Sequence, residues 1–237
     1  MTLRLSRLCA FLLLALAAPC SAATVVIWPI DPVIAAGERA TALWIENKGN
    51  APVTLQVRTL HWTQETGEDR HVDQDRIVAS PPIATVAPGQ RQLVRILRRD
   101  VADTGSGEQS YRLLIDELPP AIDTKGAEPG PRAQLAVQMR YSIPLFVHAG
   151  ASATAQPVLV ARILLSEGRR FLVVTNSGAR HARLVDLRGA RTPLLTGLIG
   201  YVLPGQTMRW PLPDAAADLG KLTVNVNGTD TVLPITA

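Results

Sequence analysis

The sequence predicts an all-β protein made of two tandem immunoglobulin-like β-sandwich domains. Three observations predict this fold class. Nearly every segment after residue 23 is short and either β-branched or alternating in polarity, turn-forming residues recur every eight to fifteen positions, and no window of twelve residues shows a helical period. Short strands at such spacing are typical of β-sandwiches. The 237 residues are enough for a leader and two domains of about 100 residues each.

The first 23 residues, MTLRLSRLCAFLLLALAAPCSAA, have the three parts of a secretory signal peptide. Arg4 and Arg7 give a basic start, residues 8–18 form an apolar run, and small residues lead to a cleavage position near Ala22 or Ala23. The apolar run is too short to span a bilayer, which takes about 20 residues, and no later run reaches that length. We therefore expect an exported protein without membrane insertion.

Cysteine and charge content narrow the class of protein further. Both cysteines, Cys9 and Cys20, lie in the leader, so we expect the mature chain to have no disulfide and no thiolate metal site. Removing the leader also removes two arginines and no acid, which lowers the formal net charge from +4 to +2 (22 basic minus 20 acidic residues). A basic stripe with interleaved aromatic residues is missing, and nucleic acid is therefore not an expected partner.

The strands predicted for the first domain, residues 24–150, follow one another between clear turns. In order they are TVVIWPI, RATALWIEN, PVTLQVRTLHW, RQLVRILR, SYRLLIDEL and AQLAVQMRYSIPLFVHA. The segments between them are rich in the turn formers Gly, Pro, Asn and Asp, as in NKGNAP, ETGED and APGQ. This pattern predicts a complete sandwich in the first half of the chain.

A stretch of small residues, 147–157, leads into the second domain, residues 151–237. Its predicted strands are VLVARILL, RRFLVVTNSG, ARLVDLR, TGLIGYVLPGQTMRWPL and LTVNVNGTDTVLPI. Two pieces repeat the first domain in form: LWIENKGNAPVTLQV is echoed by LVVTNSGARHARLVDL, and VAPGQRQLVRI by VLPGQTMRWPL. This repetition favours two copies of one sandwich, divided near Gly150. Asn227-Gly228 also fits a glycosylation sequon, but between two apolar runs it predicts a hairpin turn.

The last strand of the first domain is too long for its own sandwich. In residues 133–149 every second position is apolar, which is the pattern of a strand with one buried face: Leu135, Val137, Met139, Tyr141, Ile143, Leu145 and Val147. The run covers roughly 45 Å at about 3.3 Å per residue, whereas a usual strand has about 5–6 residues. The surplus apolar face indicates that part of the strand is buried against something other than its own domain.

Motifs for catalysis are missing from the sequence. The four histidines are dispersed, and no two have metal-ligand spacing: His61, His71, His148 and His181. Asp116 and Glu117 adjoin on one predicted strand, where neighbouring side chains point to opposite faces, so they cannot act as an acid–base pair. We therefore expect no enzyme, no catalytic residue, no cofactor and no metal site.

Taken in order, several segments resemble the periplasmic chaperones of the chaperone–usher pilus pathway, the PapD-like family. The matching segments are VIAAGERATALWIENKGNAPVTLQV, APGQRQLVRI, YRLLIDELPP, AQLAVQMRYSIPLFV, LVVTNSG and VLPGQ. The resemblance implies a periplasmic protein whose partners are fimbrial (pilin) subunits and an outer-membrane usher. It also implies that free copies cap one another in a self-capping oligomer.

The resemblance also assigns a role to the long strand. Subunits of this family lack the last strand of their own sandwich, and a chaperone strand fills the resulting groove. On this reading Leu135, Val137, Met139 and Tyr141 are offered to the subunit, in donor-strand complementation. The remaining apolar residues of the strand, from Ile143 onward, are expected to stay in the core of the chaperone.

The sequence departs from the family at the residues that grip the carboxylate terminus of the subunit. Many members use an Arg on the first strand and a Lys on the seventh, but here WPIDP has no basic residue and Pro144 takes the lysine position. This pattern resembles the archaic, spore-coat-U-associated branch. We expect Arg95 to be the primary carboxylate anchor and Arg140 its helper. The alternative is that Arg95 pairs with Glu117 and only stabilises the first domain.

The match to the family also implies an interdomain contact made by Glu117, His148 and Asn227. Two other functions are compatible with an exported protein of this fold class. The first is an exported two-domain adhesin or surface structural module, which would have the same fold and leader. The second is a sandwich-fold hydrolase, for which the sequence has no nucleophile motif.

Overall fold

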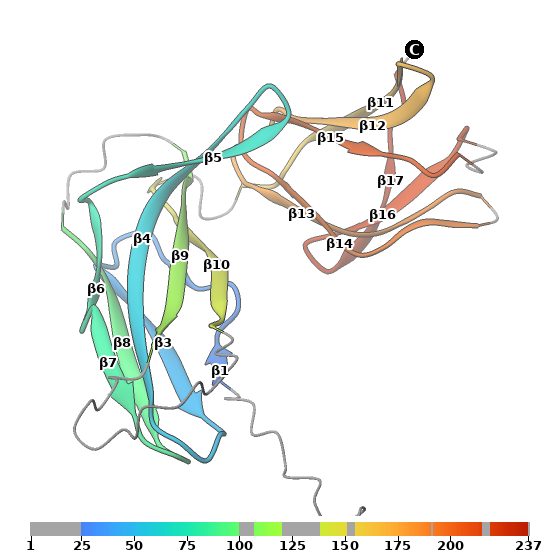
Figure 1. Cartoon of the computed structure of the whole chain (residues 1–237). Helices are drawn as coiled ribbons and strands as arrows, with labels where there is room; N and C mark the ends of the chain where they lie inside the picture. The colour runs from blue at the N-terminus through green and yellow to red at the C-terminus, as the bar shows by residue number, and fades with distance from the viewer. Residues whose placement is uncertain are drawn as a thin grey trace, which may run out of the picture.

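The computed structural model describes residues 25–99, 107–119, 138–150, 155–190, 192–214 and 219–236. These residues form the strands β1 to β17, with no α-helix among them. They build two immunoglobulin-like β-sandwiches, which confirms the predicted fold class (Figure 1). Within the same residues no helix is long and apolar enough to cross a membrane. The predicted signal peptide lies outside the described residues.

The N-terminal domain packs two sheets face to face. The strands of the first sheet, in spatial order, are β1 (Val25–Trp28), β3 (Ala40–Asn47), β8 (Arg91–Arg98) and β6 (Ile77–Ser80). Those of the second are β2 (Val33–Ile34), β10 (Arg140–Val147), β9 (Gln109–Leu118), β4 (Val53–Glu65) and β5 (Glu68–Asp73), with β7 (Ile83–Val86) also paired to β4. The core between the sheets comes from alternate residues of each strand, as the period of two predicts.

The C-terminal domain has the same two-layer plan. One sheet has the order β11 (Leu159–Ser166), β12 (Arg169–Asn176), β15 (Thr207–Pro211). The other has the order β14 (Pro193–Val202), β13 (Ala182–Arg188), β16 (Leu222–Val226), β17 (Thr229–Leu233). The turn between β16 and β17 is Asn227-Gly228, with φ of 51° and 92°, as two-residue hairpins of this type require. The predicted hairpin is therefore confirmed.

The repeat seen in the sequence is a repeated hydrogen-bonded corner. Asn47 and Asn176 are both buried, at the end of β3 and of β12. In each domain this amide donates to two backbone carbonyls: Asn47 to Ala51 (2.7 Å) and Val86 (2.9 Å), Asn176 to Arg180 (2.7 Å) and Val202 (3.0 Å). Buried amides satisfied in this way fix the path of the chain at both places. The two domains thus share one local solution to the same turn.

At one corner of contact between the two domains, the β4–β5 hairpin reaches the C-terminal domain (Figure 1). Trp62 and Phe146 from the first domain pack with Tyr201 and Leu203 from the second in a small separate core. Gln64 adds two buried hydrogen bonds: its side-chain amide donates to the Tyr201 carbonyl and its oxygen accepts from the Leu203 N–H, both at 2.9 Å. This corner sets how the domains face each other.

Candidate functional site

The strand β10 leaves part of its outer edge without a partner strand. On its inner side it pairs with β9 along its whole length, and the Glu117 N–H donates to the Met139 carbonyl at 3.0 Å. On its outer side β2 pairs only with Phe146 and Val147, where the Phe146 N–H donates to the Pro32 carbonyl at 3.2 Å. Residues 140–145, called here the open edge, face no other strand within the described part of the chain.

The backbone groups of the open edge follow from the alternation along an antiparallel strand. Because Met139 and every second residue after it face β9, the outward groups belong to Arg140, Ser142 and Pro144. Arg140 and Ser142 each present one N–H and one C=O, whereas Pro144 presents only a C=O. Proline at such a position is confined to edge strands, since a central strand would need its N–H. The edge can therefore accept one further strand.

A groove of about 340 Å³ runs along the open edge, and we call it the edge groove. β1, which is itself the edge strand of the other sheet, forms its opposite side with Val25 and Ile27. Tyr141 connects the two sides, because its hydroxyl contacts the backbone of Val25. The apolar lining and the unpaired backbone together suit an extended apolar segment.

Two arginines line the edge groove, one from each domain, and they are Arg112 on β9 and Arg183 on β13. The guanidinium of Arg112 lies 3.8 Å from the centre of the Trp62 ring, and its nearest acid is Asp69, also at 3.8 Å. Its Nε has no hydrogen-bond partner among the described residues. Burial lowers the pKa of Arg112, and Asp69 only partly opposes this effect. An anion entering the groove would therefore lie near Arg112, a cation with only a distant acid as its partner in this protein.

The predicted donor residues are divided by the boundary of the described residues. Leu135 and Val137 lie outside them, whereas Met139 is 45% exposed and Tyr141 is half-buried. The apolar residues that follow on the same face of the strand are buried in the core of the N-terminal domain: Ile143, Leu145 and Val147. The alternation therefore crosses from the core of the domain to an exposed position within one strand.

The predicted anchors, Arg95 and Arg140, are not brought together by the structure. Arg95 is exposed on the outer face of β8, and the inner face of this strand is formed by Val94 and Ile96. Arg140 is on β10, in the other sheet, and its guanidinium binds Asp116, which also accepts from Arg58 at 2.8 Å. Leu93 and Leu97 share this outer face with Arg95 and are half-buried.

The alternative pairing of Arg95 with Glu117 does not form either. Glu117 is buried on β9, in the second sheet, where its carboxylate accepts from the Tyr141 hydroxyl at 3.2 Å. Nor does Glu117 reach the domain interface, because it lies at the opposite end of β9 from that contact. The groove arginine Arg112 was missed because nothing in the sequence marks one outward arginine on a strand.

The acid at the domain interface is Glu108, one residue before β9. It lies 3.2 Å from Nε2 of His148 and 2.8 Å from Nδ1 of His181. The side chain of Asn227 stays within the C-terminal domain, where it accepts from the Arg183 N–H at 2.8 Å and donates to the His181 carbonyl at 3.0 Å. Strand pairing could have identified Glu108, since Gln109 faces Val147 and their neighbours Glu108 and His148 must then be adjacent.

Comparisons with known proteins agree with this architecture. A family model described as "Pili and flagellar-assembly chaperone, PapD N-terminal domain" matches residues 25–150. No curated protein matches the sequence. A solved structure of the CsuC–CsuE complex of chaperone and tip adhesion subunit, from the archaic chaperone–usher Csu pili of Acinetobacter baumannii, has a chain with 29% identity and a TM-score of 0.74, which covers 91% of this chain and 100% of that one.

Two more distant structures share the fold. The Salmonella enterica SafA pilin in complex with the SafB chaperone matches with 17% identity and a TM-score of 0.63, over 90% of this chain and 95% of that one. The CupB2 chaperone of Pseudomonas aeruginosa matches with 17% identity and a TM-score of 0.59, over 89% and 100%. The similarity to the Csu structure agrees with the predicted archaic branch. Since the family model spans more than half of the 237 residues, the chain belongs to the PapD-like family of pilus assembly chaperones.

Proposed function

We propose that this chaperone acts in the periplasm, where it binds incomplete fimbrial subunits by donor-strand complementation and delivers them to an outer-membrane usher. The observation that carries the proposal is the open edge of β10 beside the apolar edge groove. Strand addition to such an edge supplies backbone hydrogen bonds along the strand and side-chain pockets at alternate positions. Membership of the pilus assembly chaperone family supports the same function.

The donor residues would be those that continue the buried row of β10 beyond the core. Ile143 is buried, Tyr141 is half-buried and Met139 is exposed, so the apolar face emerges from the domain along this sequence. Leu135 and Val137 extend the same alternation. Burying three such side chains in a subunit would contribute on the order of 5–8 kcal/mol before ordering costs.

The carboxylate terminus of a subunit would need a cation at the inner end of the open edge. Arg112 and Arg183 are better placed for this role than Arg95 and Arg140, because both line the edge groove. Arg95 is on the outer face of the other sheet, and Arg140 is already paired with Asp116. Arginine can meet a carboxylate with two parallel hydrogen bonds, and Arg112 has unused donor capacity.

Free chaperone would use the same edge to cap a second copy of itself. An unpaired strand edge with apolar side chains associates readily with another edge. The capped form would give way when a subunit binds, because both partners need the same backbone groups. The division into residues 24–150 and 151–237 is part of this proposal: the first domain would carry the donor strand and the second would complete the groove.

The experiment is copurification from the periplasm of cells that express the chaperone with a candidate subunit. Met139→Arg and Val137→Arg should each leave the chaperone folded but remove the subunit, because a charge would be buried unpaired in the subunit groove at a cost of several kcal/mol. The matched control is Leu165→Arg, at an apolar residue of the second domain that is 69% exposed. It should retain the subunit.

Two outcomes would contradict the proposal. If Met139→Arg itself unfolds, the residue belongs to the core of the chaperone and is not offered to a partner. If the wild-type protein copurifies alone or as a polymer, the adhesin or structural-module function is the better explanation.

A further inference from the structure

The carboxylate of Glu108 is completely buried between the two domains, with a side-chain exposure of 0%. It accepts hydrogen bonds from both the ring and the backbone of His181, at 2.8 Å to Nδ1 and 2.9 Å to the N–H. Nε2 of His148 lies 3.2 Å away, and Nε of Arg180 lies 3.9 Å away. Among the described residues, the charged or titratable groups in contact with this carboxylate are therefore all basic side chains.

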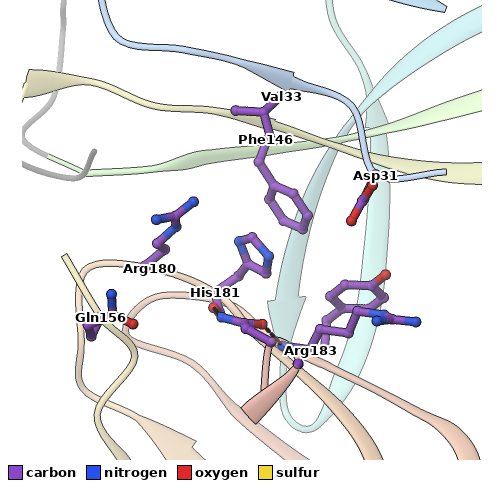
Figure 2. Close-up of a pocket in the computed structure, with 10 residues that line it drawn as sticks. Asp31, Val33, Phe146, Gln156, Arg180, His181 and Arg183 are labelled. Carbon is purple, nitrogen blue, oxygen red and sulfur yellow. Dashed lines mark hydrogen bonds between the residues drawn. The ribbon is translucent and has the colours of Figure 1, made fainter. Parts of the chain in front are cut away.

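These four residues tie the two domains together. Glu108 and His148 belong to the N-terminal domain, at adjoining ends of β9 and β10, whereas Arg180 and His181 precede β13 of the C-terminal domain. The His181 ring also stacks on Phe146 of β10, with ring centres 3.5 Å apart and an angle of 5° between planes (Figure 2). Asn227 fixes the His181 backbone from the β16–β17 turn. The contact is thus built from side chains with little freedom to rearrange.

The charges balance only while the imidazoles are neutral. Glu108 supplies one negative charge and Arg180 one positive charge, and His181 in its Nδ1–H form donates without any further charge. Burial holds the pKa of His148 below its ordinary value of 6.5, and Arg180 adds to this effect while Glu108 opposes it. Nε2 of His148 makes no hydrogen bond despite its closeness to Glu108. A proton on His148 would add a second cation beside Arg180, next to a carboxylate whose single charge Arg180 already balances.

We propose that Glu108, His148, His181 and Arg180 form a proton-sensitive clasp, which holds the domains together near neutral pH and releases them as the pH falls toward 5. The second interdomain contact, through Gln64, would remain as the hinge; the Gln64 amide also donates to Asp69 of its own domain at 2.9 Å. The other charged groups near the clasp are Asp31 and Arg183, which line an adjoining cavity of about 420 Å³ and carry opposite charges. They do not favour either protonation state strongly.

The sign of the effect follows from linkage. When the clasp is open, His148 is hydrated and takes up a proton at its ordinary pKa of 6.5, whereas in the closed clasp the pKa is lower. The open form therefore binds more protons below pH 6.5, and acid shifts the equilibrium toward it. At pH 5 the shift in the ratio of open to closed protein can reach about 30-fold, the limit for a closed clasp that takes up no proton.

The edge groove has walls from both domains, so opening of the clasp would also widen the groove. That consequence rests on the proposed function, but the clasp itself does not. The test therefore uses the mature chaperone without a subunit, and its result is independent of whether the groove binds subunits.

The experiment measures the distance between the domains by paired spin labels. The mature chain is expected to have no cysteine, so Ile83→Cys and Leu165→Cys, at residues 50% and 69% exposed, would be its two labelling sites. We expect a narrow distance distribution at pH 7.5 and a broader, longer one at pH 5. His148→Gln should abolish the response, because the glutamine amide is polar but takes up no proton between pH 7.5 and pH 5. His61→Gln is the matched control: burial also lowers the pKa of His61, but it lies in another cavity, and the response should persist.

An unchanged distance in the wild-type protein between pH 7.5 and pH 5 would overturn the proposal, and so would a change that persists in His148→Gln. If His148→Gln does not fold, the ring of His148 can be titrated by NMR in the wild-type protein. Protonation of this ring must then accompany the change in distance. A distance change without it would assign the switch to another group.

Discussion

The two domains are built alike but differ in what borders the free edge of one sheet. In the C-terminal domain the segment after β17 contacts the edge of β11 at one residue: the Ala161 N–H donates to the Pro234 carbonyl and its carbonyl accepts from the Thr236 N–H, both at 2.8 Å. In the N-terminal domain β2 covers only the last two residues of β10, and the rest of that edge stays open. Among the described residues both edges are thus largely uncovered, but the edge of β10 borders the edge groove, which has walls from both domains.

This difference teaches where the function can be placed. Both domains keep the buried asparagine corner, so the corner belongs to the fold and not to the activity. The unpaired backbone and the poorly paired Arg112 occur together in the N-terminal domain, facing the interface. The site is therefore indicated by the groove and the poorly paired arginine beside the open edge, and not by the open edge alone.

The largest effect is expected when the shared corner is removed. Asn47→Ala and Asn176→Ala each leave one buried and one partly buried carbonyl without their donor, at about 1–3 kcal/mol for each such group. The free energy of unfolding of the affected domain should fall by about 3 kcal/mol or more, measured by denaturant titration. The control is Asn225→Ala, an exposed amide that bonds Asp230, and it should change little. If Asn225→Ala and Asn47→Ala had the same free energy of unfolding, the corner would not contribute to stability.

The second prediction locates the point where β10 leaves its own core. Leu145→Ala should lower the free energy of unfolding by about 2–5 kcal/mol, since the side chain is fully buried. Met139→Ala, six residues earlier on the same face, should cost almost nothing in the absence of a subunit. Thermal melts of both variants measure the contrast. Similar losses would mean that the whole strand belongs to the core.

The third prediction separates the two candidate anchors. Arg112→Leu should weaken subunit capture by about 10- to 100-fold, the worth of one hydrogen-bonded charge pair of about 1.5–3 kcal/mol. Arg95→Ala should leave both capture and the melting temperature close to wild type, because its side chain is exposed. Binding to a subunit with a free or an amidated carboxyl terminus provides the measurement. If Arg95→Ala lost subunit capture while keeping native stability, Arg95 would be the carboxylate anchor, as the sequence predicts.

The smallest effect concerns the acid stability of the open edge. Burial alone would raise the pKa of Asp116, but hydrogen bonds from Arg140 and Arg58 outweigh it and hold the pKa below 3.8. A carboxylate with a lowered pKa contributes stability above its ordinary pKa and loses it as the pH falls through the folded value. Arg140→Gln should therefore melt slightly earlier than wild type at neutral pH, with the difference shrinking below pH 4. A difference that persists at pH 2 would assign the effect to packing.

The sequence predicted the parts of the fold that depend on local pattern. Alternation located most of the strands, and the echo of LWIENKGNAPVTLQV by LVVTNSGARHARLVDL predicted the repeated sandwich, in which Asn47 and Asn176 form equivalent corners. The strand β5 was not predicted, because all six of its residues are exposed and they show no apolar period. It is defined instead by its pairing with β4 across the turn at Thr66 and Gly67, both with positive φ.

The candidate site was only partly predictable, because it depends on the register between strands and on the second domain. The proposed donor face of β10 is a period-two pattern and could be predicted directly from the sequence. Glu108 lies next to His148 only because of how β9 and β10 pair, and next to His181 only because of how the domains meet. The role of Arg112 likewise depends on the ring of Trp62, which lies on a different strand.

Pro144 fixes the inner end of the open edge, where an added strand would begin to pair. Beyond it the edge is occupied by β2, and at Pro144 itself no N–H is available, so an added strand always finds its last donor at Ser142. Pairing with an added strand would therefore always begin at the same residue of β10, inside the domain. Partner strands of different length would be aligned at the same inner end and would differ only in how far they extend outward, toward Met139 and beyond.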